Sequence, residues 1–154
     1  MQQHKRAIRM MQGFAIVVLI VYIIVSVATS TRNQSIDTAT KAELASATAE
    51  AELYYDGAGA ATYEGVCGNR GVHAIGGRVH AAEQKYSKTQ TTFSDEESSE
   101  WNTAQCHDGN QAWVAWVPLT KSSQKHILAW CTDNVNGATQ TNAILAAGAL
   151  SCPQ

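Results

Sequence analysis

Cysteine is the residue type with the clearest chemistry in this sequence. The four cysteines are Cys67, Cys106, Cys131 and Cys152. An even number is typical of an exported domain that folds in an oxidising compartment. Of the three possible pairings we favour the sequential one, Cys67 with Cys106 and Cys131 with Cys152. The second disulfide would fasten a C-terminal segment that cannot order itself by burial to a strand ending at Cys131, a contribution of about 3 kcal/mol.

A zinc site is the alternative use of these side chains. Cys106-His107 would then be combined with His73, His80 or His126. Structural zinc sites usually take their ligands in close pairs, and the sequence has neither a CxxC nor an HxxxH spacing. We therefore expect no metal and no other cofactor.

The segment Asp133–Gly137, DNVNG, suggests a calcium loop. It does not fit the EF-hand pattern, because Thr132 replaces the first aspartate and Ala143 replaces the bidentate glutamate. A turn held by aspartate and asparagine side chains is the interpretation that we prefer.

Catalytic motifs are absent from the sequence. It contains no GxSxG, no P-loop, no HExxH and no recognisable pair of carboxylates. The net charge is −2, and it becomes more negative if the basic N-terminal segment is removed. We expect neither an enzyme nor direct binding of nucleic acid.

An apolar run near the N-terminus is the strongest compositional feature. Residues 1–12 carry Lys5, Arg6 and Arg9 but no acid, and residues 14–28, FAIVVLIVYIIVSVA, carry no charge. A bilayer core of about 30 Å needs about 20 helical residues, so this run is marginal as a membrane span and sufficient when tilted or partly buried in protein. Residues 16–24 are apolar on every face, which argues against an ordinary core helix.

Three interpretations of this run compete. It is a signal peptide cut after the small-x-small sequence Ser26-Val27-Ala28, an uncleaved anchor with its basic residues on the cytoplasmic side, or a helix preserved behind a leader cut between Gly13 and Phe14. All four cysteines follow the run, as expected if the remainder is exported.

The next segment favours the second and third interpretations. Residues 30–55 contain neither proline nor glycine, and one narrow stripe of apolar or small residues recurs every three or four positions: Ile36, Thr40, Leu44, Ala47, Ala51 and Tyr54. Asp56-Gly57 predicts the end of the helix, with Gly57 in the left-handed conformation. The run and the stripe therefore predict one helix from about Phe14 to Tyr55, about 60 Å long.

The second half of the sequence predicts a small antiparallel sheet. Residues 111–119 form a strand that directs Trp113, Ala115 and Val117 to one face and Val114 and Trp116 to the other, and it ends at Pro118. Residues 120–124 predict a turn, and 126–131 the returning strand.

Other segments of this half are less informative. Residues 77–86 and 88–93 have no assigned type, and 94–100 form an acidic loop or a short helix start. Of the four tryptophans we expect at least two in the core, against the alternative of a binding patch formed by Trp101, Trp113, Trp116 and Trp130.

Several segments in this order resemble type IV pilins and type II secretion pseudopilins, most closely small pilin-like proteins of candidate-phylum bacteria. The resemblance spans nearly the whole chain. The residues that carry it are the basic leader ending in Gly13-Phe14, the apolar run, KAEL (41–44), AELYYD (51–56), YEGVC (63–67), AWVAWVPL (112–119), WCTD (130–133), Gly137 and Cys152-Pro153.

The resemblance implies an α+β, pilin-like fold in which a long N-terminal helix packs on a small antiparallel sheet. The expected parts are a leader (1–13), a transmembrane and assembly helix (14–56) and a globular head (57–154) with a disulfide-bounded C-terminal loop. A prepilin peptidase would cut after Gly13, and the new amine of Phe14 would be methylated. The expected assembly surface consists of Phe14, Ile16, Val18, Leu19, Ile20, Tyr22, Ile23 and Ile24.

The resemblance also implies a location and partners. The chain would cross the cytoplasmic membrane once, with its head outside the cytoplasm, and would join other pilin subunits in a homo- or heteropolymer at the cell surface. Its function would be that of a pilin, minor pilin or pseudopilin. The alternative is a singly anchored or secreted binding domain, such as an adhesin, that does not polymerise.

The sequence departs from the family pattern around the expected cut. The fifth residue after the cut is Val18, where the family usually has a glutamate that pairs with a neighbour's amine; Ala15 and Gln12 also differ from the usual residues. An unpaired buried amine is costly. Val18 would be explained if the chain is a minor or tip subunit that never lies below another copy. It would also be explained if the leader is not processed and the chain is a plain membrane anchor.

Overall fold

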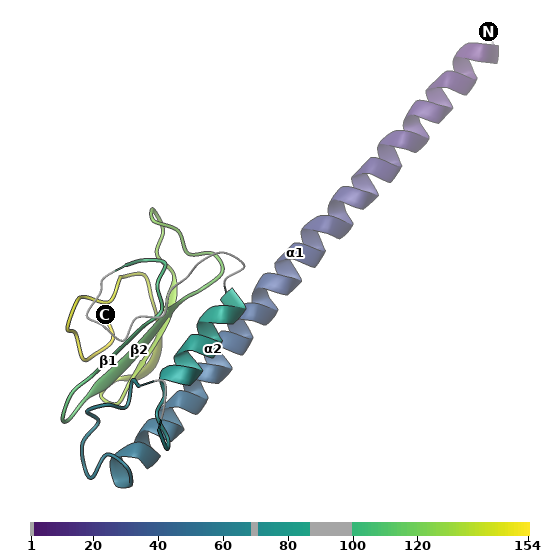
Figure 1. Ribbon diagram of the computed structural model, residues 1–154. Helices are drawn as coiled ribbons and strands as arrows, with labels where there is room; N and C mark the ends of the chain where they lie inside the picture. Colours follow the sequence, from purple (N-terminus) through teal and green to yellow (C-terminus); the bar gives the residue numbers. More distant parts are fainter. Residues whose placement is uncertain (1, 69–70, 87–99) are drawn as a thin grey trace. The chain divides into compact units, whose positions relative to one another are not determined.

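The computed structural model describes residues 2–68, 71–86 and 100–154. Within these ranges it describes the side chains of all residues except 2–15 and 85–86. In this part of the chain the fold is α+β (Figure 1). The elements in order are α1 (Gln2–Asp56), α2 (Gly76–Tyr86), β1 (Gln105–Asp108), β2 (Trp113–Pro118), β3 (Ala129–Asp133) and β4 (Gly137–Thr141). The expected long N-terminal helix and small antiparallel sheet are confirmed, although α1 begins at Gln2 and not at the expected Phe14.

The chain divides into two units, Met1–Ser35 and Ile36–Gln154. We call the second the compact unit. It begins within α1, before the expected head boundary at residue 57, because residues 36–56 of α1 contribute to its hydrophobic core.

Helix α1 ends at Asp56 as expected, but by a different turn. The amide of Gly59 donates to the Tyr54 carbonyl at 2.6 Å, and the left-handed residues are Ala60 (φ 51°) and Ala61 (φ 68°). The prediction that Gly57 adopts this conformation was wrong. Glycine is required at 59 instead, since a Cβ there would lie 2.1 Å from the carbonyl oxygen of Thr62.

The predicted stripe of α1 is the face that enters the core. Thr40, Leu44, Ala47 and Ala51 are buried, and Ile36 and Tyr54 are partly buried. Leu44 and the two alanines belong to one cluster with Val79 and Ala82 of α2 and with Trp113, Ala115 and Val117 of β2. Both helices therefore contribute to the core on one face of the sheet.

Polar contacts accompany this packing of α1. The Asp37 carboxylate accepts hydrogen bonds from the Thr120 amide (2.9 Å) and hydroxyl (3.1 Å). The Thr48 hydroxyl lies 3.0 Å from that of Thr132 on β3. These contacts fix the rotation of the helix about its own axis as well as its position.

The sheet has the order β1-β2-β3-β4, and all neighbours are antiparallel. Every residue of β2 is buried. Its second face, Val114 and Trp116, packs with Ala129, Cys131, Leu145 and Cys152, so the C-terminal segment covers the side opposite the helices. The predicted alternation along this strand and its end at Pro118 are confirmed, although the strand begins at Trp113 and not at residue 111.

The β2–β3 hairpin is confirmed, with a longer connection than expected. β3 begins at Ala129, and residues 126–128 belong to the loop, where the Leu119 amide donates to the Leu128 carbonyl at 2.8 Å. Of the unassigned segments, 77–86 belongs to α2, while 88–93 and 94–99 lie outside the described residues.

Two disulfides join irregular segments to strands. Cys67 pairs with Cys106 of β1, and Cys131 of β3 pairs with Cys152. This is the sequential pairing that the sequence analysis favoured.

The core role of α1 gives a matched test on two leucines of one helix. Leu44 is fully buried, whereas Leu53 is 52% exposed. We expect Leu44→Ala to lower the free energy of unfolding by about 3 kcal/mol and Leu53→Ala to change it by less than about 1 kcal/mol. Urea denaturation of the full chain in detergent, followed by tryptophan fluorescence, measures both. Equal losses would mean that the two faces of the helix are not distinguished by the core.

Candidate functional site

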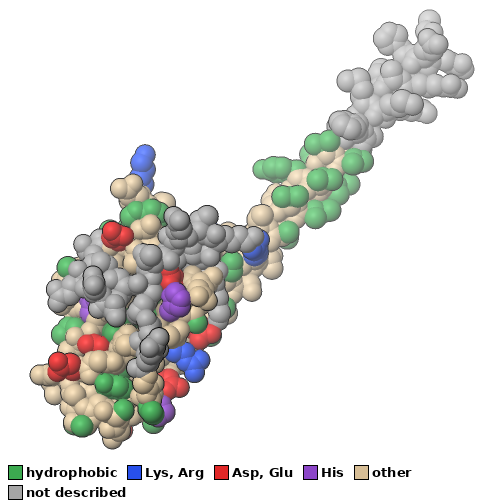
Figure 2. Space-filling model, viewed as in Figure 1, with side chains coloured by type: hydrophobic (Ala, Val, Ile, Leu, Met, Phe, Trp, Pro, Cys, Tyr) green, Lys and Arg blue, Asp and Glu red, His purple; other side chains and the backbone are tan. Residues whose placement is uncertain are grey.

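The apolar surface of α1, which we define as residues 16–27, is the principal candidate site. Its large side chains are all exposed, from 49% at Ile20 to 74% at Tyr22. Figure 2 shows hydrophobic side chains gathered along this helix. So large an apolar surface marks an interface with lipid or protein.

The length and composition of this helix are sufficient to cross a membrane. Three side-chain hydroxyls of this helix are compatible with an apolar environment, because each donates a hydrogen bond to a backbone carbonyl of the same helix. Ser26 donates to Tyr22, Thr29 to Val25 at 3.1 Å, and Thr31 to Val27 at 3.0 Å. Their polar groups therefore need no water.

The first charge after the apolar surface is the exposed Arg32. Residues 10–31 are uncharged and helical. At about 1.5 Å per residue they extend about 33 Å, which matches a hydrocarbon core of about 30 Å. Counted from Phe14 alone, residues 14–31 extend about 27 Å, so the match depends on residues 10–13 as well.

The residues expected in this surface are exposed side by side on α1: Ile16, Val18, Leu19, Ile20, Tyr22, Ile23 and Ile24. Val18, where the resembled family has a glutamate, is 52% exposed and adds to the apolar surface. Gly13 and Phe14 also lie in α1, but their side chains are outside the described set.

Most of the histidines and cysteines considered for zinc have other partners, whereas His126 is exposed. Cys106 is in a disulfide, His73 Nδ1 lies 2.6 Å from Glu50, and His80 Nδ1 lies 3.0 Å from Glu83. Over the described ranges, no group of three or more histidine, cysteine or acidic side chains is arranged to hold a metal.

The predicted turn at Asp133–Gly137 is confirmed. The Asp133 carboxylate accepts hydrogen bonds from the amides of Val135 (2.9 Å), Asn136 and Gly137 (3.2 Å), and from the Cys152 amide at 2.6 Å. Burial raises the pKa of Asp133, but these hydrogen bonds outweigh it and hold the pKa below its ordinary value. The carboxylate therefore organises the turn and the C-terminal segment in its ionised form.

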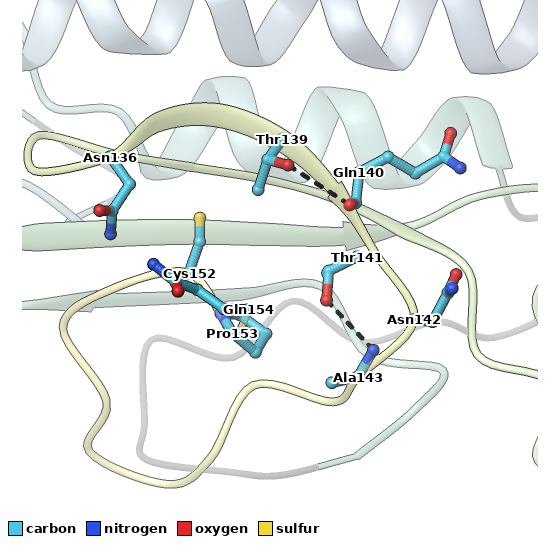
Figure 3. A pocket seen from close by; sticks show the side chains of 9 residues that line it. All are labelled: Asn136, Thr139, Gln140, Thr141, Asn142, Ala143, Cys152, Pro153 and Gln154. Atoms are coloured by element: carbon cyan, nitrogen blue, oxygen red, sulfur yellow. Dashed lines mark hydrogen bonds between the residues drawn. The ribbon is translucent and has the colours of Figure 1, made fainter.

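A pocket of about 600 Å³ lies between β4 and residues 152–154 (Figure 3). Its side chains are amides, hydroxyls, Ala143, Pro153 and the disulfide-bonded Cys152. None of these side chains is an acid or a base that could activate the hydroxyls of Thr139 and Thr141.

The tryptophans are mainly core residues. Trp113 and Trp116 are fully buried, and Trp130 is partly buried with the Lys41 ammonium 4.5 Å from its ring. Trp101 is half-buried. The prediction of at least two core tryptophans is confirmed.

Sequence reasoning missed an ionic cluster that joins α1 to His73, in the loop before α2, and to Arg78, near the start of α2. Glu50 lies between His73 and Arg78, and Arg78 also approaches Glu43 at 3.5 Å. The hydrogen bond with His73 lowers the pKa of Glu50 most, burial raises it, and Arg78 lowers it further, with a net decrease. The spacing of Glu43 and Glu50, two turns apart on one helix face, was the available signal.

Comparisons with known proteins give no further assignment. No family model, curated protein or solved structure matches this chain.

The ionic cluster predicts a pH dependence. Because the pKa of Glu50 is lower in the folded than in the unfolded chain, ionised Glu50 stabilises the fold above its ordinary pKa of 4.5, and this stabilisation is lost as the pH falls through the lower folded value. We expect Glu50→Gln to unfold at lower urea than the unmodified chain at neutral pH, and the difference to shrink below pH 4.5. Glu64→Gln, at an exposed position, is the control and should show no such trend.

The apolar surface predicts the effect of a charge near its centre. Ile20→Lys should weaken membrane insertion by about 3 kcal/mol, whereas Ile20→Leu should leave it unchanged. The membrane-bound fraction after alkaline extraction measures the effect. Full retention of the lysine variant would show that the surface is not buried in lipid.

Proposed function

We propose that this chain is a pilin-like structural subunit, anchored in the cytoplasmic membrane by α1 and able to polymerise through the same apolar surface. The observation that carries the proposal is the change of character along α1. Residues 16–27 are exposed and apolar on every face, whereas residues 40–51 bury one stripe in the compact unit. One helix thus provides a surface for lipid or other helices and a support for a folded domain.

The physical basis is that an apolar helix can be stable in two environments. Lipid before assembly and identical or related helices after assembly both remove this surface from water. The internally bonded hydroxyls of Ser26, Thr29 and Thr31 suit either environment. No catalytic step is part of this proposal.

The proposal includes processing of the leader. Lys5, Arg6 and Arg9 would stay at the cytoplasmic surface, and a prepilin peptidase would cut between Gly13 and Phe14 before methylation of the Phe14 amine. Glycine at the cut allows close approach of the peptidase to the backbone. The compact unit and its two disulfides would lie outside the cytoplasm, where disulfides persist.

Val18 favours a minor or tip position within such a filament. A subunit below no other copy has no neighbour's amine to neutralise, so it does not need a carboxylate at this position. The same residue is compatible with the second candidate, a solitary membrane-anchored binding domain whose leader is not removed.

The N-terminus of the mature chain separates these candidates. Intact-mass measurement of protein from its own host should find a chain that begins at methylated Phe14, and the sheared filament fraction should contain it. Gly13→Val should leave the leader attached, and Ala7→Val, the same kind of change away from the cut, should not. A mature chain that begins at Met1 or Thr29 would rule out the pilin proposal.

A further inference from the structure

Each disulfide is accompanied by an aspartate that binds the backbone of one of its cysteines. Asp108 Oδ2 accepts a hydrogen bond from the Cys67 amide at 2.7 Å. Asp133 Oδ2 accepts one from the Cys152 amide at 2.6 Å. In both cases the aspartate follows the strand cysteine by two residues, and the donor is the amide of the other cysteine of that disulfide.

This spacing has a geometric reason. Alternate residues of a strand project from the same face, so Cys106 and Asp108 on β1 face one incoming segment, and Cys131 and Asp133 on β3 face another. The two arrangements belong to different core clusters, since Cys106 packs with the helices and Cys131 with the C-terminal segment. The same pattern of cysteine, any residue, aspartate therefore occurs twice in separate surroundings.

The segments that these aspartates hold contain no helix or strand. Residues 142–154 and the described residues between α1 and α2 are turns, bends and irregular chain. Cys67 and Cys152, buried at 3% and 4% exposure, have no hydrogen-bonded ladder to place them. A carboxylate bound to the cysteine amide supplies a fixed point at the residue that must be oxidised.

We propose that Asp108 and Asp133 are positioning residues for disulfide formation, each holding the cysteine of an irregular segment beside its strand partner before the S–S bond forms. The correct pair is thereby selected from the three possible pairings. The role does not depend on the proposed function, because it concerns the folding of the compact unit in any oxidising compartment.

The chemistry that the aspartates assist is ordinary thiol-disulfide exchange. A thiolate of the pair attacks a disulfide oxidant, such as oxidised glutathione, and releases one reduced thiol. The second cysteine thiolate then displaces the other half of the oxidant. Two cysteine thiols lose two protons and two electrons, and the oxidant is reduced to two thiols. The aspartate neither gains nor loses a proton and acts through the amide.

Selective effects on the two disulfides test the proposal. The full chain in detergent is equilibrated in glutathione buffers, trapped and mapped for each disulfide. We expect Asp108→Ala to lower the equilibrium constant for Cys67–Cys106 about tenfold and to leave that for Cys131–Cys152 within about twofold, because a hydrogen bond to a charged group has this magnitude. Asp133→Ala should show the converse. Asp108→Asn, which keeps an acceptor oxygen, should restore part of the loss, and the exposed Asp56→Ala should change neither disulfide.

Two outcomes of this experiment would overturn the proposal. Equal weakening of both disulfides in either alanine variant would indicate a general loss of stability, and no weakening would show that the hydrogen bonds do not position the cysteines. Since Asp133 also holds the β3–β4 turn, a second measurement uses Cys131→Ser/Cys152→Ser. In this double serine variant the amide at position 152 should remain protected from hydrogen exchange, and it should lose this protection when Asp133→Ala is added. Rapid exchange of the amide in the double serine variant itself, with Asp133 present, would also contradict the proposal.

Discussion

The structure depends on how one helix distributes its apolar side chains. In residues 16–27 of α1 they cover the whole circumference, and in residues 40–51 they are confined to a stripe of threonine, leucine and alanine. The hydrophobic effect therefore acts twice on the same element. It requires an apolar partner for the first region, and it directs the sheet and α2 onto one face of the second. Small residues at 47 and 51 allow this close packing of helix and sheet.

The compact unit depends on β2, whose two faces belong to separate core clusters. A small sheet with both faces covered needs two coverings, and only one of them is regular secondary structure. The second is the C-terminal segment, which contributes Leu145 and Cys152. Asp133, the disulfide of Cys131 and the hydrogen bond from the Trp116 ring to the Ala143 carbonyl at 3.2 Å hold that segment in place. Side chains and a covalent bond thus replace the backbone ladder that a further strand would have supplied.

The sequence predicted the elements whose residues have a clear period. The stripe of α1, the alternation along β2 and the β2–β3 hairpin follow from helix and strand geometry.

The sequence did not predict β4, whose residues GATQT are mostly exposed and polar. β1, with the residues QCHD, is a strand because of its pairing with β2 and not because of its own propensity. α2 begins with two glycines, and because glycine usually interrupts a helix, this helix was not predicted. The fold accounts for the first glycine, because a Cβ at Gly76 would lie 2.2 Å from the Cys67 carbonyl oxygen. The apolar surface could be located from composition, whereas the aspartate contacts and the ionic cluster join residues far apart in the chain and require the fold.

The composition of the edge strand β4 affects whether the sheet can pair with a strand of another chain. It ends the sheet and presents Ala138, Thr139 and Gln140 to solvent, with no large apolar side chain among its residues. Sheet edges pair with other chains when they are long and hydrophobic. A membrane-associated protein is concentrated in two dimensions, where such pairing would compete with any ordered contact between copies. The short polar edge disfavours amyloid-like addition of another sheet at β4.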